Sequence, residues 1–435
     1  MAIVETPLTG KAGAESLLYR KITWKLIPFL CLCYLAAYLD RINVGLAKLQ
    51  MADQLQLSEA AFGLGAGLFF VGYILFEVPS NLILQRVGAK VWIARIMITW
   101  GLLSACTMFV TTPNQFYIIR FLLGVAEAGF LPGVLYYLTL WFPTYRRGRI
   151  IALFMIGLPL SSVLGGPLSG WIMGHFDMRH GLHGWQWLFL LEGIPSVLLG
   201  VLTFWVLPNN YRQAKWLSED EKQRIAEDLA QDDAEASHSK HSFRDGFFNL
   251  KVWMLGGIDF SILLSAYAMG FWMPTFIKTA GVTNITTIGL LTALPSVAAL
   301  LGMLLIGTSS DRMRERRWHI IVPFIVGAMA MAGSTFFTHN VIATVLLFSV
   351  AQAAIIGAVP VFFSLPATFL RGTAAATGFA LACSLANIAG LVSNSLMGLA
   401  LDLTGKSGGA LWAFAGCLLI SSLLVVALPA KVVNR

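Results

Sequence analysis

Four ionisable side chains interrupt apolar stretches in the first third of the sequence. Asp40 and Arg41 are neighbours in a stretch that reads YLAAYLDRINVGLA, and Arg120 and Glu127 lie seven residues apart in a second one. A carboxyl group can take up and release a proton, and a guanidinium can hold a carboxylate through two parallel hydrogen bonds. These residue types therefore predict a site for proton exchange and anion binding.

The composition indicates what kind of structure must position these side chains. Of 435 residues, 57% are hydrophobic and 12% are charged, with a mean hydropathy of +0.74. A soluble domain has about a quarter of its residues charged. Backbone groups inside lipid must be hydrogen-bonded within their own segment, which predicts transmembrane helices. The sequence therefore predicts an all-α integral membrane protein.

Twelve apolar runs are each near the length of about 20 residues that crosses the hydrocarbon core. They are residues 22–46, 60–84, 91–110, 116–142, 150–176, 185–207, 252–277, 285–308, 320–338, 341–365, 374–401 and 410–428.

One long polar stretch divides the runs into two sets of six. We expect residues 22–208 and 251–429 to form two six-helix bundles, joined by a cytoplasmic linker at 209–250 that contains a short amphipathic helix. Residues 1–21 and 430–435 are then cytoplasmic tails. Similar segments recur at about half the chain length, which indicates duplicated units that alternate access to a central site.

The basic residues predict the orientation. If both ends of the chain are cytoplasmic, only Lys48, Arg179, Lys278 and Lys406 fall on the outer side, as the positive-inside rule requires. This topology also accounts for the net charge of +8, so no nucleic-acid partner is expected. The spans contact membrane lipid instead.

Helix geometry predicts how the four charges are arranged. Asp40, Arg41 and Arg120 share a depth about 6–9 Å from the outer ends of their helices, while Glu127 lies about 10 Å deeper. We therefore expect Asp40 to pair with Arg120, which leaves Arg41 for a ligand or for Glu127. Tyr38 shares a helical face with Arg41, whereas Asp40 points about 100° away from Arg41.

These positions suggest a division of roles. Asp40 and Glu127 are the candidates for proton coupling, Arg41 and Tyr38 for anion binding, and Arg120 for a charge-pair partner. The alternative is that the charges only hold helices together. Ionisable residues inside a membrane are functional by default, which favours the first interpretation.

Several longer motifs resemble a known family. GTSSDRMRERR at 307–317 resembles the G-x-x-x-D-R loop motif of the major facilitator superfamily, and its counterpart SNLILQRVGAK at 80–90 has Gln85 in place of the usual Asp. The strings YLDRINVG, FEVPSNL, RFLLGVAEAGFLPG, GWQWLFLLEGIP and FFSLPATFLRGTAAATG resemble its anion:cation symporter branch. Within that branch, the sequences of these motifs are most similar to those of bacterial tartrate-type transporters.

The resemblance covers nearly the whole chain, and it implies the two-bundle fold of that superfamily. It further implies proton-driven uptake of organic anions, such as hydroxy-dicarboxylates, sugar acids or aromatic carboxylates. The family places substrate contacts on the helices that carry Ser364 and Asn387. Tyr73 could donate a hydrogen bond to the anion, with packing as an equal alternative.

Other polar residues are weaker candidates. Glu77 is more consistent with gating or a structural role, and Glu192 with a structural role. Asp259 is either a proton relay or a hydrogen-bonded link between helices. His175, His180 and His183 are interpreted as loop residues, since their spacing fits no regular metal site.

No cofactor, metal or catalytic triad is expected, and no P-loop motif is found that would point to ATP. A secondary carrier is favoured over a membrane-embedded receptor or a membrane enzyme. Anion exchange and sodium coupling remain open alternatives to proton symport. We expect a monomer in a bacterial inner membrane, and the sequence does not identify the substrate.

Overall fold

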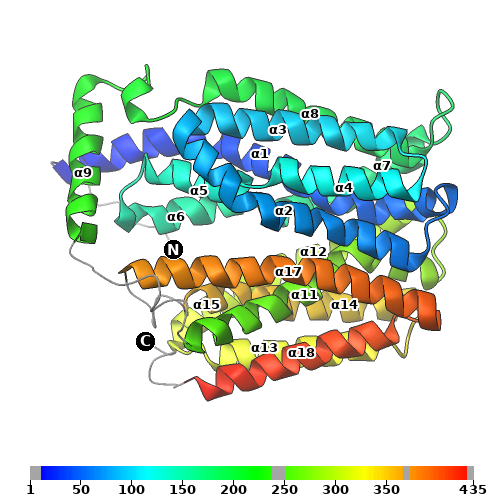
Figure 1. Ribbon diagram of the computed structural model, residues 1–435. Helices are drawn as coiled ribbons and strands as arrows, with labels where there is room; N and C mark the ends of the chain where they lie inside the picture. The colour runs from blue at the N-terminus through cyan, green and yellow to red at the C-terminus, as the bar shows by residue number, and fades with distance from the viewer. Residues whose placement is uncertain (1–10, 238–249, 366–371, 429–435) are drawn as a thin grey trace, which may run out of the picture.

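The computed structural model describes residues 11–237, 250–365 and 372–428, and the regular elements of this part are helices (Figure 1). Side chains at 11–14, 233–237, 372–384 and 386 are not described. The first ten residues of the expected N-terminal tail, the whole expected C-terminal tail at 430–435, part of the expected linker and residues 366–371 lie outside the described residues.

The first half contains eight α-helices, several of which are two parts of one span. They are α1 (Lys11–Gln54), α2 (Glu59–Val87), α3 (Ala89–Cys106), α4 (Pro113–Glu127), α5 (Phe130–Thr139), α6 (Thr144–Met155), α7 (Gly157–Phe176) and α8 (Gly184–Val206).

The helix α9 (Glu219–Ser237) follows α8, after the short 3-10 helix η2 (Tyr211–Gln213), and precedes the second half. The second half comprises α11 (Leu250–Thr279), α12 (Ile285–Met313), α13 (Trp318–Ser334), α14 (Val341–Gly357), α15 (Val359–Phe363), α17 (Gly372–Thr404) and α18 (Gly408–Ala427).

These helices have the length and composition of membrane spans. Among the described residues, ten segments are long and apolar enough to cross a bilayer, and α13 is a shorter apolar helix. α17, at 33 residues, also has the length of a span. The predicted all-α membrane class is therefore confirmed.

The chain reverses between α2 and α3, and the span formed by α4 and α5 is interrupted. Gly88 and Gly129 adopt φ values of +95° and +87°, which L side chains rarely adopt. At Gly129 the interruption directly follows the last residue of α4, Glu127. A break in the middle of a membrane span leaves backbone groups without intrahelical partners, and such breaks are common at binding sites.

The helix α9 lies at one end of the molecule, across the ends of the first-half helices (Figure 1). A capping box starts it: Glu221 N donates to Ser218 Oγ, and Ser218 N donates to the Glu221 carboxylate. The Tyr19 hydroxyl donates to Asp228 at 2.6 Å, and Trp216 stacks on Trp141. These contacts attach α9 to the first half.

The two halves meet along two seams, α2 against α17 and α7 against α12. Small residues allow close approach: a Cβ at Gly166 would collide with Thr292, and one at Gly289 with the carbonyl of Gly166. In Figure 1, α2 and α17 converge toward the end of the molecule away from α9. The halves are thus packed together most tightly at that end.

Candidate functional site

Asp40 lies among neutral hydrogen-bond donors, in a pocket between α1, α3 and α8. Its side chain is 1% exposed. One carboxylate oxygen accepts hydrogen bonds from Trp100 Nε1 at 2.6 Å and Ser196 Oγ at 3.0 Å, and the other accepts from Ser104 Oγ at 2.8 Å. Three donors from two helices fix this carboxyl group in position.

The expected pairing of Asp40 with Arg120 is therefore wrong. Depth along the membrane predicted it, but partner choice also depends on the direction in which each side chain points. Asp40 points toward α3 and α8, where Trp100 and two serines supply the donors. The expectation that Asp40 and Arg41 serve different surroundings is confirmed.

Arg41 forms an ion pair with Glu127, which joins α1 to the last residue of α4. The Glu127 side chain is 3% exposed and that of Arg41 is 14% exposed. Only one oxygen of Glu127 is used, and its Oε2 has no hydrogen-bond partner. Arg41 Nε also lacks one, so both members of the pair retain unused hydrogen-bonding capacity.

Aromatic rings surround the guanidinium of Arg41. Its Cζ lies 5.1 Å from the ring centroid of Phe69, 5.3 Å from that of Tyr73 and 5.8 Å from that of Tyr38. Cation–π contacts at these distances stabilise a cation and restrict its position. The structure thus brings the predicted residues Tyr38 and Tyr73 to Arg41.

Arg120 is a second guanidinium at the same ring. It is 1% exposed, and its Cζ lies 5.1 Å from the Phe69 centroid, on which Arg41 also stacks. Its Nε and Nη2 have no hydrogen-bond partner, and it forms no ion pair with any described residue. The carboxylates of Glu127 and Asp40 act on Arg120 from a distance, without a direct contact. A buried cation without an ion-pair partner is costly, so this position favours an anion.

The interruption after α4 contributes to the same site. The α4 helix ends at Glu127, so its C-terminal carbonyl groups carry partial negative charge beside the carboxyl group. That charge favours the cation Arg41 there. A straight helix through Gly129 would satisfy those carbonyl groups internally and remove this contribution.

Two residues predicted in the second half are not brought into contact with Arg41. Ser364 is half-buried and donates its hydroxyl to the carbonyl of Val361 at 2.6 Å, within the same span. Asn387 is half-buried on α17, and no hydrogen bond joins it to another described residue. One turn beyond it, Gly390 packs on the ring of Phe70.

Sequence reasoning missed several members of the site. Phe69 lies between the two guanidiniums, and Tyr267 of α11 faces Arg41 from the second half, with its ring 4.7 Å from that of Phe70. Phe69 is four residues before Tyr73, so the helical face of Tyr73 could have indicated it. Nothing in the sequence indicated Tyr267.

The remaining buried acids differ in their surroundings. Glu192 accepts hydrogen bonds from Asn43 Nδ2 at 2.9 Å and Ser169 Oγ at 2.7 Å, and so links α1, α7 and α8. Asp259 is 3% exposed, and no hydrogen bond joins it to a described residue, which contradicts the hydrogen-bonded link considered for it. Neither acid contacts a described cation.

A cavity of about 130 Å³ lies between the two halves beside this cluster. Tyr38 lines the cavity and also contacts Arg41 in the cluster. The cavity also contacts Asn43 of α1, Ser162 of α7, Thr292 of α12 and Gln352 of α14. Its lining contains neutral polar and apolar side chains and no Asp, Glu, Lys, Arg or His. Charge is therefore confined to the side of the site formed by α1, α2 and α4.

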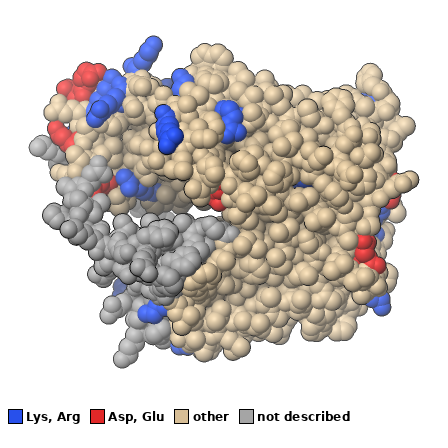
Figure 2. Space-filling model, in the orientation of Figure 1, with Lys and Arg blue, Asp and Glu red and all other residues tan. Residues whose placement is uncertain are grey.

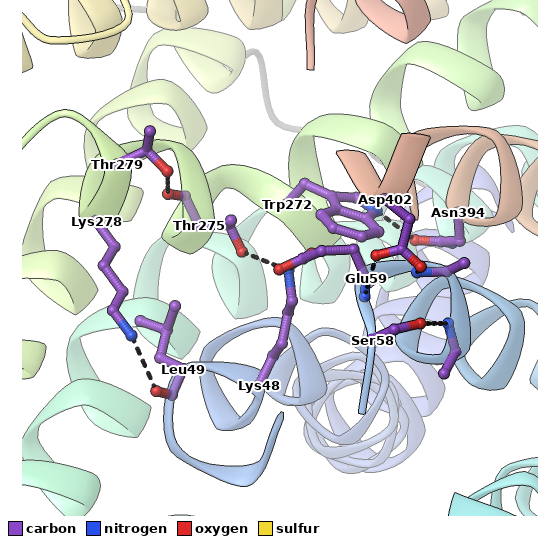
Figure 3. Close-up of polar contacts among 12 residues, drawn as sticks. Lys48, Leu49, Ser58, Glu59, Trp272, Thr275, Lys278, Thr279, Asn394 and Asp402 are labelled. Carbon is purple, nitrogen blue, oxygen red and sulfur yellow. Dashed lines mark hydrogen bonds and ion pairs between the residues drawn. The ribbon is translucent and has the colours of Figure 1, made fainter. Parts of the chain in front are cut away.

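The end of the molecule away from α9 is closed by contacts between the halves (Figure 3). Lys48 of α1 is 4% exposed, forms an ion pair with Glu59, and donates to Thr275 Oγ1 of α11 at 3.2 Å. Its ammonium lies 4.0 Å from the Trp272 ring centroid. This lysine is thus enclosed by groups from both halves.

A second contact closes the same end. The Asp402 carboxylate of α17 accepts hydrogen bonds from the backbone N–H groups of Glu59 at 2.8 Å and Ala60 at 3.0 Å (Figure 3). It therefore caps the N-terminus of α2 from the other half. Lys278 adds a bond to the carbonyl of Leu49 at 3.3 Å.

Comparison with known proteins identifies the family. The sequence profile described as Major Facilitator Superfamily matches residues 30–394. The chain belongs to the Major Facilitator Superfamily. The predicted family and its two-bundle fold are confirmed, and the chain is a membrane transporter by family.

Relatives cover almost the whole length of this transporter. It is 81% identical over 418 residues to the "Putative metabolite transport protein NicT" of Pseudomonas putida, covering 96% of both chains. It is 42% identical over 414 residues to a "Putative tartrate transporter" of Agrobacterium vitis, covering 95% of this chain and 92% of the relative.

A solved structure shows the same fold. A bacterial homologue of the human lysosomal transporter Spinster, in an inward-facing and occupied conformation, superposes with a TM-score of 0.73. The match covers 96% of this chain and 97% of the other at 15% identity.

Proposed function

We propose that this transporter takes up a small organic anion together with protons, by alternating access in a bacterial inner membrane. The first candidates are tartrate, other hydroxy-dicarboxylates and sugar acids. The observation that carries the proposal is the unequal pairing of the two buried arginines. Arg41 is neutralised by Glu127, while Arg120 remains buried without an ion-pair partner among the described residues.

This arrangement makes a proton and an anion bind together. A proton on Glu127 removes its negative charge and releases Arg41, which can then bind a substrate carboxylate bidentately. When Glu127 loses the proton, it competes again for Arg41 and favours release of the substrate. Arg120 supplies the second positive charge, which suits a dianion or a hydroxy acid with several oxygens.

Asp40 is the second candidate for proton binding. Its three donors are neutral, so no cation has to move when its charge changes. We assign substrate contacts to Arg41, Tyr38 and Tyr73 from the first half. Ser364 and Asn387 are proposed to reach the substrate only after the halves rearrange.

We place both ends of the chain and α9 in the cytoplasm. Residues 22–208 and 251–429 are taken as the two moving bundles, residues 209–250 as their linker, and the transporter as a monomer. The end closed by Lys48 and Asp402 then faces outward, so the structure corresponds to the state that opens to the cytoplasm.

Uptake by purified protein tests the proposal directly. Proteoliposomes with an acidic exterior and no sodium should accumulate labelled tartrate, and a protonophore should abolish the accumulation. Accumulation that requires sodium, or that occurs only with anion inside, would replace proton symport by sodium coupling or exchange. A receptor would bind tartrate without any uptake.

An aromatic carboxylate is the second candidate substrate. The observation that favours it is the set of rings around Arg41, which could stack on a second ring as well as on a guanidinium. Competition against labelled tartrate by aldonates, aldarates, phthalate and hydroxyphenylacetate ranks these classes. Preferential competition by an aromatic acid would reassign the substrate without altering the proposed coupling.

A further inference from the structure

The outer face of α3 carries one charged residue among apolar ones. Val91 is 41% exposed and Leu102 is 51% exposed, and Arg95 lies between them at a spacing that keeps all three on one helical face. Because α3 is a membrane span, this face contacts lipid. A guanidinium on a lipid-facing surface needs either a route to water or an anion.

Contacts fix the direction of the Arg95 side chain. Its Cζ lies 3.9 Å from the ring centroid of Trp92, one turn nearer the start of the helix. Trp92 is held in turn, since its Nε1 donates to Ser80 Oγ of α2 at 2.9 Å. Arg95 therefore extends back toward the N-terminal end of α3, and its Nε has no hydrogen-bond partner.

That direction brings the guanidinium to the level of lipid headgroups. Arg95 is six residues beyond Ala89, where α3 begins, which places its Cα about 9 Å inside the helix. A long side chain that runs back toward the helix end covers much of that distance. Trp205, 74% exposed near the end of α8, marks the same interface, where tryptophan is enriched.

Two more basic residues lie at this end. Arg86 is exposed in the last turn of α2, and Lys90 is half-buried at the second position of α3, where its backbone N–H donates to Asn209. No described carboxylate forms an ion pair with Arg86, Lys90 or Arg95.

Two other arginines at this end of the molecule are neutralised. Arg146 pairs with Glu15 and Arg147 pairs with Asp232. In Figure 2, many Lys and Arg side chains gather at the α9 end of the visible face, a few charged ones lie at the opposite end, and the broad region between the two ends is almost free of charge. The cluster of Arg86, Lys90 and Arg95 thus lacks a counter-charge from the described protein.

We propose that Arg95, held against Trp92, forms a binding site for the phosphate of an anionic phospholipid. The guanidinium lies over the indole and can donate two hydrogen bonds to phosphate oxygens. The acyl chains lie along Val91 and Leu102. This site depends on the membrane span and not on the proposed substrate.

Lipid titration of the detergent-solubilised protein tests the site without any transport measurement. The melting temperature is followed as short-chain phosphatidylglycerol, phosphatidylcholine or inorganic phosphate is added. For the wild type, we expect a saturable rise with phosphatidylglycerol, a much smaller one with phosphatidylcholine, and none with inorganic phosphate. An equal response to inorganic phosphate would overturn the assignment to a lipid.

The variant Arg95→Gln should weaken the apparent affinity for phosphatidylglycerol about fivefold or more, since each basic residue near a membrane surface contributes to anionic lipid binding. Arg95→Lys keeps the charge and loses the planar fork, so its apparent affinity for phosphatidylglycerol should lie between those of the wild type and Arg95→Gln. The matched control is Lys25→Gln, because Lys25 is an exposed basic residue next to an exposed tryptophan, Trp24, on α1.

Equal losses in Arg95→Gln and Lys25→Gln would mean that surface charge in general attracts the lipid, and the site would be rejected. If Arg95→Gln does not fold, Arg95→Lys decides the matter. A wild-type response in that variant, together with a reduced one in Lys25→Gln, would also contradict the proposal.

Discussion

The two halves of this transporter share a fold but differ in the charge they bury. Among described residues, the first half contains buried Asp40, Lys48, Arg120, Glu127 and Glu192, whereas the second half contains only Asp259. The other buried polar residues of the second half are Ser, Thr and Asn side chains. The buried charge that could bind an ionic substrate is therefore concentrated in the first half.

This asymmetry suits alternating access. A charged surface that slides past an opposing charge must break an ion pair in a medium of low dielectric constant, which is costly. The facing wall of the cavity, with Thr292 and Gln352, is neutral and requires no such step. We infer that the first half holds the ions while the second half opens and closes around them.

The largest expected effect is at Arg41. Arg41→Lys keeps the positive charge but cannot bind a carboxylate through a planar fork, and hydrogen bonds between charged groups contribute about 1.5–3 kcal/mol. Tartrate binding to the purified protein should weaken roughly 10- to 100-fold in a direct binding assay. The control is Arg20→Lys, on the exposed face of α1. An unchanged affinity in Arg41→Lys would locate the anion elsewhere.

Glu127 separates binding from coupling. Glu127→Gln resembles the protonated acid permanently, so Arg41 stays available for the anion. We expect this variant to bind tartrate and exchange it across the membrane, but not to accumulate it under a pH gradient. Accumulation equal to that of the wild type would reduce Glu127 to a structural role and leave Asp40 as the coupling residue. Loss of exchange as well would show that Glu127 is needed for binding.

Glu192 is the matched control for that experiment, because it is equally buried but contacts only Asn43 and Ser169. Glu192→Gln should retain accumulation. It should lower the free energy of unfolding by about 1–3 kcal/mol, since the amide offers a donor where two donors already point. Loss of accumulation in this variant would extend proton coupling beyond the arginine cluster.

Much of the fold and part of the site could be predicted from the sequence. Apolar runs determine the membrane spans, because length and hydropathy have to match the bilayer. Charges inside such runs are rare enough to mark the site, which is how Asp40, Arg41, Arg120 and Glu127 were found. The face shared by Tyr38 and Arg41 followed from helical periodicity alone.

Partner choice could not be predicted, because it depends on how helices rotate against one another. Trp100 and Ser196 are unremarkable residues of distant apolar runs, yet they take the place at Asp40 that was expected for Arg120. Phe69 and Tyr267 were missed for the same reason: an aromatic residue in a membrane helix is usually a packing residue. Only the assembled bundle shows which ones face a cation.

A substitution at Lys48, at the boundary between the halves, is expected to have a smaller effect than those at Arg41 and Glu127. Lys48→Met removes the bond to Thr275 and the cation–π contact with Trp272, both of which cross between the halves, and this should favour opening of that end by about 1–3 kcal/mol. Spin labels at Asp53→Cys and Lys406→Cys should then show a larger population of long distances. Lys222→Met on α9 should leave the distribution unchanged. An unchanged distribution in Lys48→Met would show that the small-residue seams alone hold this end closed.

The smallest expected effect concerns α9, which is attached to the first half partly through the solvent-exposed ion pair between Lys21 and Glu221. Burial raises the pKa of Glu221, but hydrogen bonds from Lys21 and Ser218 together with the charge of Lys21 outweigh it and hold the pKa below its usual value.

A pKa of Glu221 that is lower in the folded state than in the unfolded state stabilises the folded state at neutral pH. This stabilisation is lost as the pH falls through the folded-state pKa. Because the pair is partly exposed, we expect Glu221→Gln to weaken α9 attachment by at most about 1 kcal/mol, and less at high salt. Hydrogen exchange of α9 at neutral pH should rise a few-fold in the variant at low salt, and should approach that of the wild type on acidification, once intrinsic rates are corrected. A tenfold or larger increase that persists in high salt would mean that this exposed pair holds α9 more strongly than surface electrostatics allows.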